Sequence, residues 1–146
     1  MIQKLQEIAE EYLPPILLRT LLRGFYQIKF YFSSEKKLLR KNTELKNQGK
    51  SKRAFLLATG PSLKLENLRP LVGEDCFSLS NFFLHEDLEL IRPKLHFFAP
   101  YHPPLILENY VEWLQKADQV LPPETNIVLG TSTKELVERY HLFPQR

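Results

Sequence analysis

Three apolar runs, about twenty residues apart and each ended by a turn-forming or chain-breaking residue, constrain the fold more than any other feature of the sequence. The runs are Ala54–Ala58, Cys76–Phe83 and Leu95–Pro100. Buried parallel strands appear in sequences as short apolar runs, and this spacing leaves room for one return segment between successive strands. Short helical segments are expected around residues 65–71 and 86–91. The pattern predicts an α/β protein with a parallel sheet.

The same alternation continues toward the end of the chain. Residues 104–115 carry apolar side chains three and four positions apart, which predicts a helix. Residues 126–129 form a fourth apolar run, and the hydroxyl of Thr131 or Thr133 is expected to cap a last helix. Because a parallel sheet is usually covered on both faces and has more strands, we expect the amino-terminal part of a larger domain.

The charged residues divide the chain into two parts. Residues 1–53 hold 12 Lys and Arg against 5 acidic residues, whereas residues 54–146 hold 8 against 12. We interpret residues 1–50 as a basic amphipathic helical segment and linker, and residues 51–146 as an incomplete Rossmann-like nucleotide-binding domain with about four strands. This charge asymmetry indicates that the basic amino-terminal part binds an anionic partner.

Residues 13–32 combine a wide apolar face with Arg19, Arg23 and Lys29, and two prolines open the segment. The segment is too short and too charged to span a bilayer. It is predicted to lie in the interface of an anionic membrane, so that the protein is cytoplasmic and peripheral at the inner face. The alternative is an amphipathic helix that packs on the domain or on a partner. No cleavable signal peptide is predicted, and no nucleic-acid partner is expected.

Polar residues follow the first three strands, where open α/β sheets bind ligands that carry phosphate. The predicted nucleotide-binding residues are Thr59, Gly60, Pro61 and Ser62 after the first strand and Asn81 after the second. His102 follows the third strand, beside Tyr101, and is the candidate for a proton acceptor near neutral pH. The favoured alternative is that His102 is a loop histidine bonded to the backbone.

The segments Thr59-Gly60-Pro61-Ser62-Leu63 and Asn81-Phe82-Phe83 resemble two motifs of the bacterial sialyltransferases with a Rossmann-like fold and of the related 6-hydroxymethylpterin diphosphokinase-like proteins. These families have an Asn-Gly-Pro-Ser-Leu turn and a later Cys-Asn-aromatic-Phe segment. The resemblance covers roughly residues 53–102. It implies that Gly60, Ser62 and Asn81 hold the cytidine monophosphate part of a nucleotide-sugar donor. The activity it implies is sugar transfer to envelope or lipid-linked glycans.

The chain departs from the sialyltransferase pattern in two places, since Thr59 and Ala99 stand where the family has asparagine. The nucleotide base is therefore left open. The resemblance also places the catalytic histidine and two tyrosines downstream of the third strand, and the sequence reaches Arg146 before a matching segment. Catalytic residues thus remain unassigned. The alternatives are a diphosphokinase relative that uses ATP with a metal, and a non-catalytic fragment or binding module.

The remaining histidine and cysteine residues indicate no further chemistry. Cys76 is the single cysteine and lies in a predicted strand, which predicts a buried, inert thiol. His96 also lies in a strand and is predicted to be structural. The four histidines do not have the spacing of a zinc site, so we predict neither a metal nor a bound cofactor besides the nucleotide-sugar substrate. The oligomeric state is left open.

Overall fold

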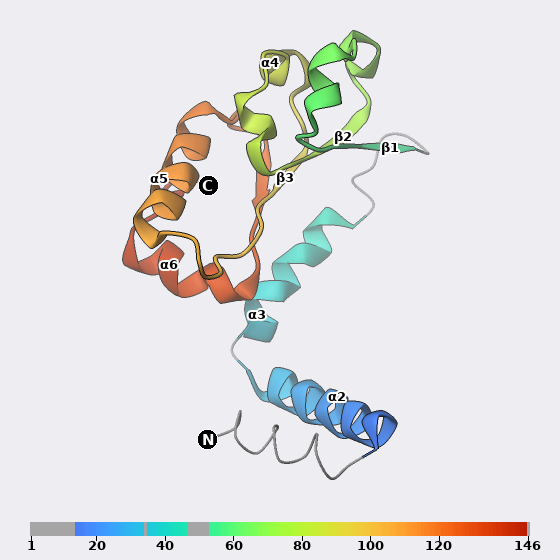
Figure 1. Cartoon of the computed structure of the whole chain (residues 1–146), viewed down its shortest axis with the longest axis vertical. Coiled ribbons are helices and arrows are strands. Elements are labelled where there is room, and N and C mark those ends of the chain that lie inside the picture. The colour runs from blue at the N-terminus through green and yellow to red at the C-terminus, as the bar shows by residue number, and fades with distance from the viewer. Residues whose placement is uncertain (1–13, 34, 47–52, 146) are drawn as a thin grey trace. The chain divides into compact units, whose positions relative to one another are not determined.

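The computed structural model of the chain describes residues 14–33, 35–46 and 53–145. The chain forms two compact units, residues 1–48 and residues 49–146 (Figure 1). The sequence predictions for the amino-terminal residues 1–13 and for most of the linker, residues 47–52, lie outside the described residues.

Unit 1 is helical. It contains α2 (Pro15–Phe32), α3 (Glu35–Leu39) and the 3-10 helix η1 (Arg40–Leu45). Pro15 stands in the first turn of α2, where a missing N–H costs no hydrogen bond, as the sequence predicts. The helix ends at Ser33, whose backbone N–H donates to the carbonyl of Phe30. No residue of α2 is buried. The predicted amphipathic helix is thus present with its apolar side chains exposed to solvent.

Unit 2 contains a four-stranded, all-parallel sheet, which confirms the predicted α/β class. The strands are β1 (Ala54–Leu57), β2 (Asp75–Leu79), β3 (Leu95–Phe97) and β4 (Asn126–Val128). Each strand pairs with the next one along the chain, in the order β1-β2-β3-β4. All four lie within the apolar runs or begin one residue before them, because only these runs can be buried without unpaired polar side chains.

The strand order places the connections on one face of the sheet. Crossovers between parallel neighbours are right-handed, so three successive steps in one direction bring all the return segments to the same side. The contacts agree, because α4 (Leu88–Ile91) touches the short helices η3 (Arg69–Leu71) and η4 (Ser80–Leu84), and η4 touches α5 (Leu107–Val120). The connections therefore form a single layer.

The hydrophobic core lies between this layer and one face of the sheet. Leu57 pairs with Ser78, Ser78 with His96, and His96 with Ile127, so these side chains share that face. The helix α5 covers it with four buried side chains spaced along one helix face: Tyr110, Val111, Leu114 and Ala117. Phe83, Phe98 and Trp113 pack together in the same core, with ring centres 4.8 to 6.3 Å apart.

The opposite face of the sheet is also apolar but does not contribute to the core. Its side chains include Phe77 and Phe97, whose rings meet edge to face with centres 6.5 Å apart, and Leu56, which is 65% exposed. Asp75 is buried at the amino-terminal end of this face and forms an ion pair with Lys94. The core among the described residues is therefore one-sided, although parallel sheets are usually covered on both faces.

The connecting segments differ from the sequence predictions. The helix expected over residues 65–71 is replaced by two short 3-10 helices, η2 (Pro61–Leu65) and η3, because Pro70 lacks the N–H that a continuous helix would need there. The helix expected over 86–91 is shortened to α4, which ends where Arg92 adopts a left-handed conformation with φ 47°.

The prediction for the last helix was wrong about its cap. A 3-10 turn, η5 (Thr131–Thr133), precedes α6 (Lys134–Arg139), and neither element has a side-chain capping hydrogen bond. Thr133 has φ −87° and ψ −8°, which is helical rather than the extended conformation of a capping residue. Its side chain is buried instead.

Candidate functional site

The predicted binding residues lie at the carboxyl edge of the sheet. In a parallel sheet all strands end at the same edge, so the segments that follow β1, β2, β3 and β4 share this edge. They are the turn at residues 59–62, Asn81 in η4, the loop from Ala99, and the turn at residues 130–133. The candidate site is therefore an array of four strand ends.

The turn after β1 is open to solvent. Thr59, Gly60, Pro61 and Ser62 are all exposed, so their polar groups are available to a ligand. Gly60 has φ −63° and ψ 146°, and its carbonyl accepts a hydrogen bond of 3.0 Å from the N–H of Leu63. This backbone conformation suits any residue, and a Cβ on Gly60 would lie 3.7 Å from Ser62 Oγ, an ordinary contact. The turn therefore does not require glycine for its own folding.

The turn after β4 repeats the geometry of the turn after β1. Gly130 has φ −66° and ψ 149°, and its carbonyl accepts a hydrogen bond of 2.9 Å from the N–H of Thr133. A serine stands two residues after the glycine in both turns, Ser62 in the first and Ser132 in the second. Sequence reasoning missed Ser132 because the segment was interpreted as a helix cap. The repeated Gly-x-Ser pattern after two apolar runs was the available signal.

The side chain of Asn81 accepts a hydrogen bond from the neighbouring helix α5. Its Oδ1 accepts from Trp113 Nε1 at 2.6 Å, and Trp113 lies on α5, 32 positions later in the chain. The side chain is nevertheless exposed. Because Oδ1 already accepts from the indole, the amide Nδ2 is the group that Asn81 offers as a donor to a ligand.

A buried histidine supports the turn that carries Asn81. His96 Nε2 lies 3.0 Å from the carbonyl oxygen of Ser80, and His96 Nδ1 lies 2.7 Å from Ser78 Oγ. Since a carbonyl only accepts, Nε2 donates and the neutral ring accepts from the Ser78 hydroxyl at Nδ1. Burial lowers the pKa of His96 to about 4, although the hydrogen bond to Ser80 acts in the opposite direction. The predicted structural role of His96 is confirmed.

The Ser78–His96 pair does not form a nucleophilic centre. Both side chains are completely buried, so no substrate can reach the hydroxyl. The pair instead connects β2 to β3 and fixes the carbonyl of Ser80, whose backbone has a positive φ of 49° at the exit of β2. Its effect on the site is to hold the position of the turn.

His102 adopts the alternative role named above, a loop histidine bonded to the backbone. Its Nδ1 lies 3.1 Å from the carbonyl of the next residue, Pro103, and the side chain is exposed. The neighbouring Tyr101 also bonds to the loop, because its hydroxyl donates to the carbonyl of Leu105 at 3.0 Å. These contacts stabilise the loop after β3.

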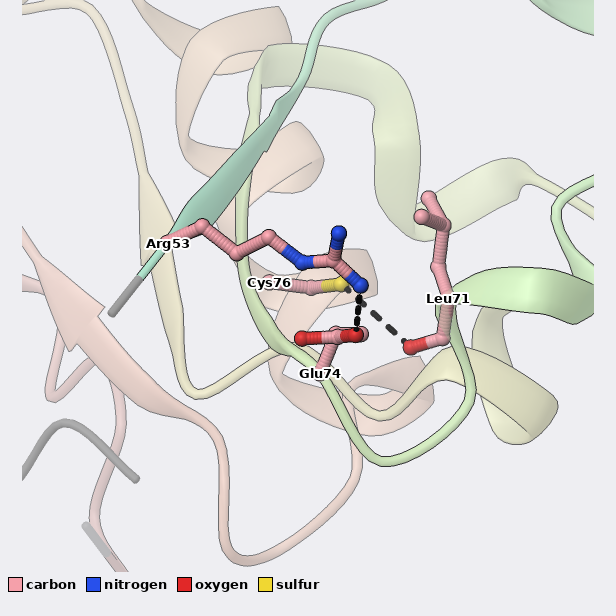
Figure 2. A network of polar contacts seen from close by, with 4 residues as sticks. All are labelled: Arg53, Leu71, Glu74 and Cys76. Carbon is pink, nitrogen blue, oxygen red and sulfur yellow. Dashed lines mark hydrogen bonds and ion pairs between the residues drawn. The ribbon is translucent and has the colours of Figure 1, made fainter. Parts of the chain in front are cut away.

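Cys76 lies on the core side of β2, away from the carboxyl edge. Its Sγ is 3.8 Å from the carbonyl oxygen of Leu71, and burial is the main cause that raises the pKa of the thiol (Figure 2). A raised pKa keeps the sulfur protonated and unreactive. Nearby, Arg53 pairs with Glu74 and connects the start of β1 to the loop before β2 (Figure 2). The prediction of a buried, inert cysteine agrees with these contacts.

A hollow of about 440 Å³ lies next to the turn after β4. Its size is within the range of small-molecule pockets. Ser132 reaches it from the turn, and Tyr101 reaches it from the loop after β3. The remaining lining residues are Leu107, Glu135, Leu136, Glu138 and Arg139. The hollow thus adjoins the β4 half of the candidate site and does not include Gly60, Ser62 or Asn81.

In the parts of the chain that the structure describes, no group of three or more His, Cys, Asp or Glu residues is arranged to hold a metal ion.

The chain was compared with protein-family models, curated proteins and solved structures, and none of them matches it. The resemblance to the sialyltransferase-like families thus rests on the two short motifs quoted above.

Proposed function

We propose that unit 2 binds the nucleotide part of a nucleotide-sugar donor, as the donor-binding half of a sialyltransferase-type glycosyltransferase does. The observation that supports this proposal best is the pair of Gly-x-Ser turns of equal backbone geometry after β1 and β4. Asn81 is presented from the end of β2, a strand that lies between these two in the sheet order. The turns after β1 and β4 stand three strand spacings apart, about 14 Å, so the three segments offer donors to different parts of an extended donor molecule.

Each segment has a distinct role in this proposal. The hydroxyl of Ser62 and the N–H groups of its turn donate to phosphate oxygens, which carry the negative charge, and the hydroxyl of Ser132 donates to the end of the nucleoside farthest from the phosphate. Asn81 donates from Nδ2 to an acceptor of the nucleoside, because its Oδ1 is bonded to Trp113. The Thr59 hydroxyl stands where the related family has a carboxamide and can both donate and accept.

The proposal concerns donor binding and assigns no general base to the described residues. His102 bonds to its own loop, and the Ser78–His96 pair is buried. Activation of an acceptor hydroxyl requires a base within hydrogen-bond reach of that hydroxyl. The proposed donor site therefore accounts for recognition of the sugar nucleotide and for its orientation at the sheet edge.

Trp113, the single tryptophan, provides a direct test because its indole N–H bonds to Asn81. Its fluorescence should change on titration with cytidine monophosphate if the nucleotide contacts Asn81. Ser62→Ala should weaken binding by about tenfold, corresponding to the loss of a hydrogen bond to a charged group, and Ser132→Ala should weaken it less, because its partner on the nucleoside is neutral. Ser51→Ala, in the sequence before β1, is the matched control and should bind as the unchanged chain does.

Thermal unfolding with different nucleotides separates this proposal from the alternatives. A nucleotide at 100 times its dissociation constant stabilises the folded state by about 2.7 kcal/mol. Stabilisation by cytidine monophosphate without metal supports the donor site. Stabilisation that requires ATP with magnesium would replace it with the diphosphokinase-like alternative. If none of the tested nucleotides changed either the fluorescence or the midpoint, nucleotide binding would be excluded.

A further inference from the structure

The helix α2 carries a continuous exposed apolar stripe. The stripe consists of five residues separated by four, four, three and four positions: Leu17, Leu21, Phe25, Ile28 and Phe32. At 3.6 residues per turn these positions fall within about 80° of the helix circumference. The five side chains are between 47% and 81% exposed. Scattered exposed apolar residues are normal on proteins, whereas a contiguous stripe of this kind marks an interaction surface.

The charge of the helix restricts what this stripe binds. Residues 14–33 contain Arg19, Arg23 and Lys29 and no acidic residue, and residues 14–46 contain eight Lys and Arg against two Glu. A second copy would bring two equally basic helices together, which like-charge repulsion opposes. A nucleic acid would attract the cations but would leave the apolar stripe in water. An anionic lipid surface can bury the apolar stripe and also attract the basic side chains.

The positions of the cations fit the same partner. Arg19 and Arg23 lie about 160° around the helix from the centre of the stripe, and Lys29 lies at its flank. With the stripe in the acyl region, both arginines therefore stand at the level of the headgroup phosphates. Tyr26, which meets Phe25 edge to face, is exposed about 140° from the centre of the stripe, on the same side of the helix as the arginines. Tyrosine is favoured at this depth because its ring is apolar and its hydroxyl is polar.

We propose that α2 lies in the plane of an anionic membrane, with the stripe in the outer part of the acyl region and Arg19 and Arg23 among the headgroups. The 18 residues of α2 extend for about 27 Å along the surface. A spanning orientation is not available, since no helix in the described ranges is both long and apolar enough to cross a bilayer. This surface is independent of the proposed nucleotide site.

Two isoleucines of the same helix provide a matched test. Ile28 is in the stripe and Ile16 is on the other side of the helix, and both are exposed. Flotation of the full chain with vesicles of phosphatidylglycerol and phosphatidylcholine measures the partition coefficient. Ile28→Gln should lower it at least about tenfold, because one side chain no longer enters the apolar region. Ile16→Gln should change it less than about twofold. Equal effects of the two variants would overturn the proposal.

A second comparison tests the charges. The double variant Arg19→Gln, Arg23→Gln should bind the anionic vesicles about 25-fold more weakly, at roughly fivefold per cation, and should bind pure phosphatidylcholine vesicles as before.

Sedimentation of the unchanged chain and of Ile28→Gln tests for a second copy. If the unchanged chain were a dimer that Ile28→Gln dissociates, with no vesicle binding by either, the stripe would be a self-association surface. If the chain bound duplex DNA but not the vesicles, the anionic partner would be a nucleic acid. Either result would contradict the proposal.

Discussion

The helices α2 and α5 have the same kind of amphipathic pattern and differ in what their apolar faces contact. Four side chains of α5 are buried against the sheet and its connections, whereas α2 buries none. Their charges also differ, because α5 carries Glu108, Glu112 and Asp118 against one lysine, and α2 has three cations and no acid. Periodicity therefore predicts that a helix has an apolar face, whereas the tertiary structure determines whether that face packs against other parts of the protein.

The largest expected difference between the two helices is in folding stability. Leu114→Ala should destabilise unit 2 by about 2–5 kcal/mol, because it opens a cavity at a side chain with no solvent exposure. Leu21→Ala, the matched change on α2, should alter stability by less than about 0.5 kcal/mol. Urea unfolding followed by circular dichroism measures both. Similar midpoints for the two variants would mean that α2 is packed as tightly as α5.

The buried histidine on the sheet face that α5 covers should make the folding stability of unit 2 depend on pH. The folded protein keeps His96 neutral with a pKa of about 4, whereas the unfolded chain binds a proton below the ordinary value of 6.5. This contribution is fully present above pH 6.5 and is lost as the pH falls toward 4, amounting to about 3 kcal/mol. The free energy of unfolding, measured with urea between pH 7 and pH 4, should therefore decrease as the pH falls.

The matched variant for this pH effect is His96→Gln, which keeps polar groups beside Ser78 but has no titrating group. It should flatten the stability profile between pH 6.5 and 4. An unchanged slope in the variant would assign the pH dependence to other groups. The helix α2 contains no histidine or acidic residue, so its own stability should not vary over this range.

A smaller effect is expected where α5 meets the candidate site. Trp113→Phe removes the indole donor to Asn81 Oδ1 while keeping an aromatic ring against Phe98. The loss of one hydrogen bond should cost about 1 kcal/mol of stability. Nucleotide affinity, measured by calorimetry, should fall less than it does in Asn81→Ala, since Asn81 itself remains. A stronger effect of Trp113→Phe than of Asn81→Ala would indicate that the ligand contacts the indole directly.

The smallest expected effect is at Gly24, in the middle of α2. A Cβ at this position meets no atom within 4 Å, so Gly24→Ala should stabilise the helix by about 0.5–1 kcal/mol through backbone entropy alone. Hydrogen exchange of the α2 amides should slow accordingly. Gly73→Ala is the contrasting control, because Gly73 has φ +83° and the substitution should destabilise unit 2. Faster exchange in Gly24→Ala would show that α2 is constrained by contacts at this glycine.

Sequence patterns were sufficient for the local elements of unit 2. The runs that begin at Ala54, Cys76 and Leu95 predict three strands, and the helix expected over residues 104–115 is present as α5. These predictions succeed because burial imposes a period on the sequence of each element separately. They fail in the connection around residues 65–71, where Pro70 determines the backbone more strongly than the apolar pattern does.

The candidate site was predictable only in part. The turn at Thr59–Ser62 and the position of Asn81 follow from strand ends and from two recognisable motifs. The repeated Gly-x-Ser pattern suggests that Ser132 is equivalent to Ser62, and the matching backbone angles of Gly60 and Gly130 support it. A capping hydroxyl and a ligand-binding hydroxyl have the same sequence signal, so local reasoning could not separate them.

The sequence by itself determined the strands, their parallel arrangement in an α/β unit, and the basic amphipathic helix before them. Only the tertiary structure decided the strand order, the one-sided core, the burial of His96 beside Ser78 and the bond between Asn81 and Trp113. The reason is physical: hydrophobic periodicity is a property of neighbouring residues, whereas these features depend on crossover direction and on contacts between residues far apart in the sequence, such as Asn81 and Trp113.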